Sequence, residues 1–131
     1  MDEVREETNT VSSKTHEQTG LAWYQEKRVR EICCYLTEHL DRRMTQAEIA
    51  KEFRISLTAL KLTFQCLYGM PIETYLRKKR ISEAKRLLRE TELPVSEIAH
   101  RVGYDSHSQF SAMFRTNEGQ SPMMYRQNSD T

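Results

Sequence analysis

The sequence contains few of the residues that interrupt regular secondary structure. It has four glycines and three prolines in 131 residues. Apolar and polar residues nowhere alternate over a sustained stretch, as they do in a half-buried β-strand. These two absences argue against a fold built on a sheet. They predict an all-α chain, helical almost throughout from Leu21 onward.

Long hydrophobic runs and a framework of cysteines are also lacking. No apolar run approaches the roughly 18 residues of a transmembrane helix, so no membrane association is expected. The first ten residues, "MDEVREETNT", are acidic and contain no apolar segment of the kind found in secretory signals. Cys33, Cys34 and Cys66 are odd in number and lack the spacing of a disulfide scaffold. A reducing cytoplasm is therefore expected, with Cys33 and Cys34 as buried or half-buried thiols rather than a redox sensor.

The residue combinations that carry catalysis or hold metals are missing too. His100 and His107 have no cysteine or acid at ligand spacing. No Ser/His/Asp or Cys/His arrangement, glycine-rich phosphate loop or pair of carboxylates stands out. The sequence therefore predicts no enzyme activity, no metal and no cofactor.

Charge is distributed unevenly along the chain, although the formal net charge is only +1. Residues 1–20 contain five acids and two bases, whereas residues 21–131 contain 18 bases and 14 acids. The strongest basic cluster is "RKKR" at 77–80. Charge alone leaves two interpretations open: a solvated helix face, or the electrostatic footprint of a nucleic-acid-binding protein.

Residues 1–20 are rich in Thr, Ser, Glu and Gln and have no aromatic side chain, so we expect a disordered N-terminal tail or linker there. Two explanations stay open: a stand-alone small domain, or the end of a longer chain. The predicted organisation beyond the tail is a first unit at 21–70, a linker helix at 71–91, and a second unit at 92–131 with a short C-terminal tail.

Capping residues and stop signals define about seven helices. Thr45 and Glu48 form a capping box, because each side chain can satisfy a free backbone donor of the other. Ser56 and Ser106 can cap later helices, which Gly69 and the glycine at 119 end. The expected helices are roughly 22–40, 45–53, 56–68 and 71–90, a fifth opened by Pro94, 106–119, and a short last one from Ser121–Pro122.

One sequence pattern occurs twice in the chain. Ile49 and Ala50 reappear 49 residues later as Ile98 and Ala99. Leu60, Phe64, Gly69 and Tyr75 reappear 50 residues later as Phe110, Phe114, Gly119 and Tyr125. The one-residue slip falls in the break between two short helices, where an insertion costs least. A duplicated helix–break–helix unit of this kind predicts two helix-turn-helix subdomains.

In each repeat, one face of the second helix is not needed for packing. The inward stripes are Leu60, Phe64 and Leu67 in one helix and Phe110, Met113 and Phe114 in the other. The outward sets match at the same offset: Thr58, Lys61, Leu62 and Gln65, against Ser108, Ser111, Ala112 and Arg115. In a helix-turn-helix unit, the free face of the second helix enters the DNA major groove.

From Val29 to Gln127 the chain resembles the DNA-binding domain of the AraC/XylS family of bacterial transcription regulators. The most specific part is "SEIAHRVGYDSHSQFSAMFRTNEGQSPMMYR", which follows the family signature of an IA-x-x-x-G-aromatic turn, a Phe-x-x-x-Phe helix and a Gly-x-Ser-Pro ending in Tyr-Arg. The segment "YLRKKRISEAKRLL" follows the family's linker helix. The resemblance implies two homeodomain-like units bridged by a long helix, reading successive major grooves.

The resemblance implies a set of base-facing residues: Thr58, Lys61, Leu62, His107, Ser108, Gln109, Ser111 and Ala112. Candidate phosphate contacts are Lys51, Arg54, Gln65, Arg77, Lys78, Lys79, Arg101 and Arg115. For Arg80 and Arg126 two roles stay open: each could contact a phosphate, or each could have a structural role by pairing with acidic side chains between helices.

Departures from the family pattern affect both recognition helices. Many members carry arginine where this chain has Leu62 and Ala112, and an aromatic residue where it has Gln109. We therefore expect the second recognition helix to depend more on phosphates and DNA shape than on base contacts.

The function expected from this resemblance is sequence-specific binding of double-stranded DNA at an asymmetric two-box site. The expected role is an activator that contacts RNA polymerase in a bacterial cytoplasm, at the nucleoid. In a longer chain, an N-terminal effector or dimerisation domain would precede it. The alternative is a protein-interaction module that keeps the fold with only weak, non-specific DNA binding.

Overall fold

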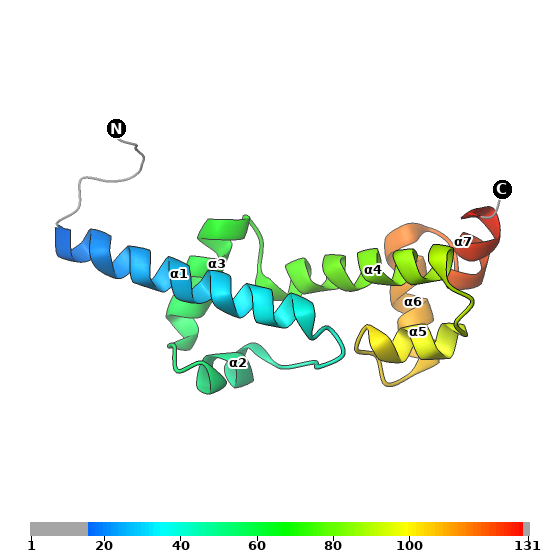
Figure 1. Ribbon diagram of the computed structural model, residues 1–131, viewed down its shortest axis with the longest axis horizontal. Coiled ribbons are helices and arrows are strands. Elements are labelled where there is room, and N and C mark those ends of the chain that lie inside the picture. The colour runs from blue at the N-terminus through cyan, green and yellow to red at the C-terminus, as the bar shows by residue number, and fades with distance from the viewer. Residues whose placement is uncertain (1–15, 130–131) are drawn as a thin grey trace.

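The computed structural model describes residues 16–129, and the side chains from residue 20 onward. This part of the chain forms seven helices and no strand, as the sequence predicts (Figure 1). The helices are α1 (His16–Glu38), α2 (Gln46–Glu52), α3 (Leu57–Tyr68), α4 (Ile72–Glu90), α5 (Val95–Arg101), α6 (His107–Glu118) and α7 (Pro122–Ser129). The molecule is elongated, with α4 joining a unit of α1–α3 to a unit of α5–α7.

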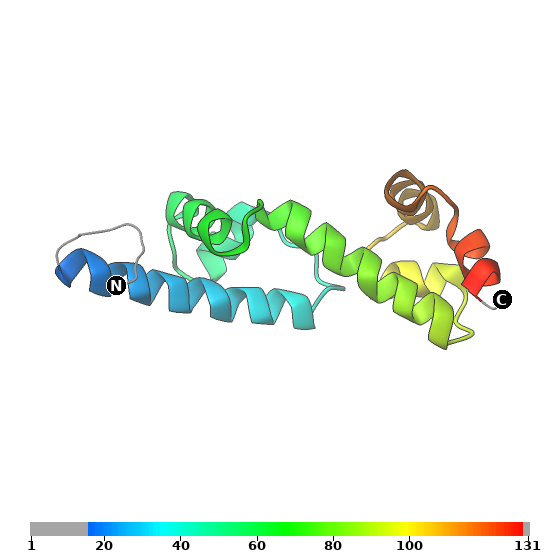
Figure 2. The same cartoon turned by 90° about the horizontal axis from the view of Figure 1, so that it is seen from above.

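Helix α1 begins at His16, six residues before the predicted start at Ala22. The expected disordered tail is therefore wrong for residues 16–20, while residues 1–15 lie outside the described part. Glu17 and Gln18 are good helix formers, and a helix already fixed by packing extends at little cost. The first turns of α1 project beyond the rest of the molecule (Figure 2), and there Leu21, Trp23 and Tyr24 are exposed.

The first unit packs three helices and the start of α4 around one apolar core. Val29, Ile32 and Leu36 of α1 lie against Leu60 and Phe64 of α3. These five side chains are almost completely buried. Val29, Ile32 and Leu36 thus form the inward-facing stripe of α1.

The three thiols of this unit differ in exposure. Cys33 is buried, but Cys34 and Cys66 are exposed. The expectation of a buried or half-buried thiol is therefore wrong for Cys34. Adjacent residues of a helix point about 100° apart, and Cys34 falls on the solvent side.

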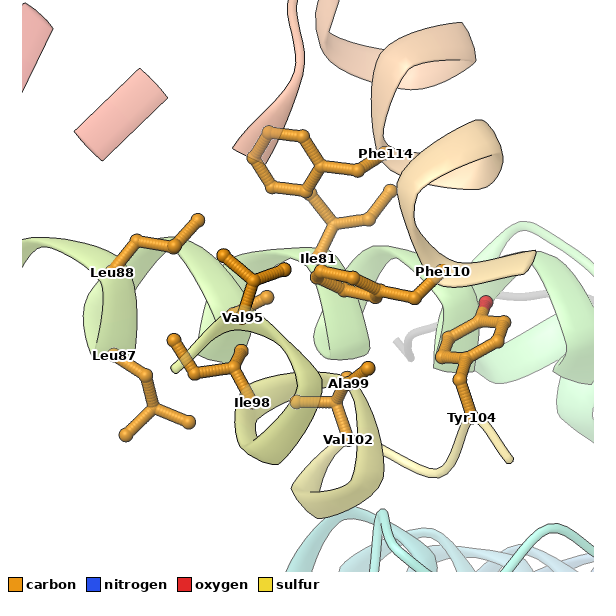
Figure 3. Close-up of a cluster of buried hydrophobic side chains, with 11 residues drawn as sticks. Ile81, Leu87, Leu88, Val95, Ile98, Ala99, Val102, Tyr104, Phe110 and Phe114 are labelled. Atoms are coloured by element: carbon orange, nitrogen blue, oxygen red, sulfur yellow. The ribbon is translucent and has the colours of Figure 1, made fainter. Parts of the chain in front are cut away.

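The second unit repeats this design. Phe110 and Phe114 of α6 are fully buried and lie against Ile98 of α5 and Ile81 of α4 (Figure 3). Tyr125 of α7 closes the cluster with its ring edge toward Phe114. Each unit is therefore a three-helix core in which α4 supplies part of the apolar surface.

The predicted caps are present. Thr45 and Glu48 form the full capping box, with backbone-to-side-chain hydrogen bonds of 2.8 and 3.1 Å. Ser56 Oγ accepts from the Ala59 amide, and Ser106 Oγ accepts from the Gln109 amide. Helices α3 and α6 thus begin with the same kind of N-cap. Pro71 and Pro94 occupy the N-cap position itself, just before α4 and α5, rather than the first helical turn.

Arg126 has a structural role, with partners different from those expected. Its Nε donates to the Leu88 carbonyl at 3.0 Å, and its Nη2 donates to the carbonyls of Thr91 and Leu93. These are carbonyls at and beyond the end of α4, which a helix leaves without partners of its own. The expectation of acidic partners is therefore wrong: the guanidinium of Arg126 holds the C-terminal end of α4 against α7.

The two units meet at a tight junction. Arg80 of α4 is buried and donates from Nε to the Leu40 carbonyl, just beyond α1, again a carbonyl rather than an acid. Gly103, in the turn after α5, lies beside the same carbonyl and has a φ of +95°. A Cβ at Gly103 would overlap the Leu40 oxygen and come within 2.9 Å of Arg43 Cγ. Glycine is therefore required at 103 by both space and backbone conformation.

Gly103→Ala is predicted to destabilise the fold by ~3 kcal/mol, because it combines left-handed strain with overpacking. Gly119→Ala is the matched control. Gly119 has a φ of +79° but no atom within 4 Å of the added Cβ, so only ~1 kcal/mol is expected. Urea denaturation of both variants measures the difference, and equal losses would show that the contact at the junction does not matter.

Candidate nucleic-acid interface

Helix α3 separates its packing face cleanly from its outward face. Leu60 and Phe64 are fully buried. All four outward residues of α3 are exposed: Thr58, Lys61, Leu62 and Gln65. Leu62 is the clearest case, because this large apolar side chain is 67% exposed and touches no core cluster. The structure therefore leaves this face of α3 available to a partner.

Helix α6 has the same division at the matching positions. His107, Ser108, Gln109, Ala112 and Arg115 are exposed, while Ser111 is half-buried. Met113, predicted to point inward, is also half-buried and packs against the second core. Ser108, Ser111 and Ala112 give the middle of this surface small side chains, and Arg115 is the basic residue of its last turn.

The two helices lie on the same side of the molecule. Figure 2 looks nearly along the axes of both α3 and α6, which lie on the same edge of the elongated shape and are separated along it by part of α4. Helices α1 and α5 lie on the opposite side, and α4 crosses from the side of α3 to that side. This arrangement brings the two helices that carry the predicted base-facing residues to the same side of the molecule.

The candidate phosphate contacts are exposed, but not all are free. Within the described residues, Lys51, Arg77, Lys78 and Arg115 make no ion pair. Arg101 Nε lies 3.1 Å from the Glu97 carboxylate. Lys79 Nζ lies 5.3 Å from the centre of the Tyr75 ring. Arg54 lies in the break between α2 and α3 with a φ of +56° and is the one described non-glycine residue in that region.

The basic run at 77–80 does not form one patch. Successive residues of α4 turn by about 100°, which divides the four side chains among three surroundings. Arg77 lines a cavity between the two units, and Lys78 lines a separate one beside Lys85 and Asn117. Lys79 lies over Tyr75, and Arg80 is buried. Only part of this charge cluster can therefore act together on one ligand.

Arg43 is a candidate that sequence reasoning missed. Its guanidinium stacks 4.7 Å from the centre of the Tyr104 ring and lines the same cavity as Arg77 and Arg80. Burial, and then the charge of Arg43, lower the pKa of Arg80. In the sequence Arg43 stands in an ordinary polar loop, so no local pattern marks it. Only the docking of the second unit brings Tyr104 beside it.

Other site chemistries find no support in the described part of the chain. It contains no group of three or more His, Cys, Asp or Glu side chains that could hold a metal ion. None of its helices combines the length and apolar character needed to cross a bilayer.

Comparison with known proteins identifies the domain. Residues 49–128 match the family model described as a helix-turn-helix domain. The arabinose operon regulatory protein of Escherichia coli K12 is 33% identical over 102 residues, covering 77% of this chain and 35% of that protein. The transcriptional activator AarP of Providencia stuartii is 33% identical over 103 residues, covering 79% of this chain and 76% of AarP.

Solved structures agree with these matches. The C-terminal domain of AraT, a response regulator from Geobacillus stearothermophilus, superposes with a TM-score of 0.73 at 34% identity, covering 77% of this chain and 84% of that one. The DNA-binding domain of the global transcriptional factor AdpA, solved with a target DNA, gives 0.72 at 28% identity, covering 77% and 91%. The chain spans only about a third of the length of the two arabinose operon regulators that it matches.

The separation of the two faces of α3 can be tested with one substitution made at two sites. Leu60→Ala is predicted to cost ~3 kcal/mol, because it leaves a cavity in the first core. Leu62→Ala is predicted to change stability by less than ~0.5 kcal/mol, because its side chain is exposed. Thermal and chemical unfolding measure both. A large loss at Leu62 would mean that the outward face takes part in packing.

Proposed function

Because the chain belongs to the AraC-type helix-turn-helix family of DNA-binding transcription regulators, we propose that it reads an asymmetric, two-box site on double-stranded DNA. One observation carries this proposal: α3 and α6 stand on the same side of the molecule with their unpacked faces exposed. Successive major grooves on one face of B-DNA are separated by roughly 34 Å. The two outward faces differ in sequence, so the two boxes should differ as well.

In this proposal α3 supplies most of the direct base readout. Lys61 can donate to guanine O6 and N7, and Thr58 and Leu62 can contact a thymine methyl group. Leu62 supports this role physically, because covering its exposed apolar surface with a methyl group removes both from water. Gln65 extends the same face toward the backbone.

Helix α6 reads its box more weakly. Gln109 can pair with adenine, and His107 can donate or accept at a base edge. The small side chains of Ser108, Ser111 and Ala112 allow close approach but offer little discrimination. Arg115 would bind the backbone beyond them. Affinity at this box therefore depends on phosphates and on groove shape.

Phosphate contacts by Lys51, Arg54, Lys78, Lys79 and Arg101 would set the register of the protein on the duplex. The proposed output is transcription activation on the bacterial chromosome, with RNA polymerase as the protein partner. Effector sensing and dimerisation would belong to a separate domain, since two DNA-reading units and their linker account for the described helices. AarP, a relative of which the chain covers three quarters, bears the name of an activator.

Selection from a random duplex pool at moderate salt, with non-specific competitor, tests the proposal directly. The expected product is an asymmetric motif with two boxes one helical turn apart. Lys61→Ala should relax the preference at one position of the first box and cost ~2 kcal/mol there. Arg115→Ala should weaken all sequences alike, because a phosphate contact carries no base information.

Circular dichroism of both variants controls for folding. Enrichment of the first box alone would mean that α6 acts as a clamp without sequence preference. No enrichment, with binding that vanishes as salt rises, would refute the two-box proposal and favour a protein-interaction module.

The spacing of the boxes gives a second test. Five base pairs inserted between them turn the second box to the far side of the duplex, and affinity should fall to that of the first box alone. Ten inserted base pairs return the second box to the same face of the duplex as the first, but move it one helical turn farther away. Because α4 holds α6 at a fixed distance from α3, affinity should not recover. Full recovery at ten base pairs would show that the two units move independently.

A further inference from the structure

A cavity in the middle of the molecule lies between the two DNA-reading units. Its volume is about 280 Å³, and its walls come from the loop that leads into α2, the N-terminal half of α4 and the turn before α6. The polar residues of these walls include Arg43, Arg77, Arg80, Glu73 and Tyr104. The cavity therefore joins the loop that leads into α2 in the first unit to the turn that leads into α6 in the second.

Positive charge outnumbers negative charge in this cavity, since three arginines line it together with a single carboxylate, that of Glu73. Among the described residues, no carboxylate forms an ion pair with Arg43, Arg77 or Arg80, although Glu73 lies in the same wall. This contrasts with the exposed arginines nearby: Arg42 pairs with Glu52 at 3.0 Å, and Arg86 pairs with Glu83 at 2.7 Å. Unpaired arginines beside a buried one form a site that favours an anion.

The geometry of Arg43 suits a fixed, planar contact. Its guanidinium is held against the Tyr104 ring, and its fork of N–H groups matches an oxygen pair of a phosphate. Arg77 faces the same space from α4. Arg80 already donates a hydrogen bond to the Leu40 carbonyl, so it contributes positive charge to the cavity rather than a direct contact with a phosphate.

In the proposed DNA complex, the sugar-phosphate backbone would pass the middle of the molecule, where this cavity lies. A duplex that offers two successive major grooves to α3 and α6 turns its minor groove toward the protein between them. The two backbones that border the minor groove then pass the middle of the molecule, where the N-terminal half of α4 lies (Figure 2).

We propose that Arg43 and Arg77 bind phosphodiester groups of the duplex between the two boxes, forming a third DNA contact at the junction of the units. This inference rests on the proposed function. The contact would carry no base information, but it would fix the distance between the boxes, because it ties the DNA to the segment that sets the orientation of both units.

Hydroxyl-radical footprinting on the selected duplex tests the proposal. The wild-type protein should protect backbone between the boxes, and Arg43→Gln with Arg77→Gln should lose that protection while keeping both boxes. Affinity should fall on the order of tenfold for each arginine. The slope of log K against log salt should become shallower by about 0.9 for each phosphate that the variant no longer neutralises.

Arg86→Gln is the matched control, since it removes one arginine charge from the exposed side of α4 and should leave protection and slope unchanged. Arg43→Lys keeps the positive charge but loses the planar guanidinium that lies over Tyr104. This variant should retain partial protection of the DNA backbone between the boxes. Thermal unfolding of every variant separates loss of binding from loss of fold.

If the double variant kept the wild-type salt dependence of binding and the wild-type protection of the backbone between the boxes, the inference would be overturned. The two-box proposal would stay intact. Protection reduced equally in Arg86→Gln would also overturn it, because general charge would then explain the effect. If the wild-type protein selected no site and Lys61→Ala changed nothing, the proposed function itself would fail, and the junction contact with it.

Discussion

The close approach of the Gly103 turn to the Leu40 carbonyl fixes how the two units sit. Arg80 donates to that same carbonyl from α4, and Arg43 stacks on Tyr104 immediately beside it. Three segments far apart in the sequence therefore converge on one oxygen atom. Because α4 is a single helix built into both cores, this junction holds α3 and α6 at one distance and one relative angle.

The two units show which parts of a duplicated domain can diverge and which cannot. Arg54 and Gly103 occupy matching turns, 49 residues apart, and both have positive φ. Arg54 is exposed, so the first unit tolerates a strain of ~1–2 kcal/mol there. Gly103 touches the other unit, where no Cβ fits. The outward faces of α3 and α6 are not needed for the cores, so their side chains are free to differ.

The net charge of +1 understates the positive charge available to a DNA partner. Several acidic side chains form ion pairs with neighbouring basic side chains: Glu52 with Arg42, Glu83 with Arg86, Glu97 with Arg101 and Glu118 with Lys85. These pairs are at least partly exposed and contribute little to stability. They do, however, leave the cations of the junction and of the outward faces without acidic partners in the described part of the chain. The potential that DNA meets depends on this arrangement and not on the sum of charges.

The all-α fold, the seven helices and most helix ends could be predicted from sequence because they depend on local physics. Thr45, Ser56 and Ser106 cap helices through bonds that span three residues, and Phe64 and Phe114 face inward because helical spacing places them there. The duplicated sequence pattern also indicated which faces of α3 and α6 are not used for packing. The tertiary structure decided what depends on distant parts of the chain. Arg80 and Arg126 bind carbonyls rather than acids, the run at 77–80 is divided among three surroundings, and Arg43 meets Tyr104 across 61 residues of sequence. Such contacts follow from the docking of one unit on another, and no local pattern encodes that docking.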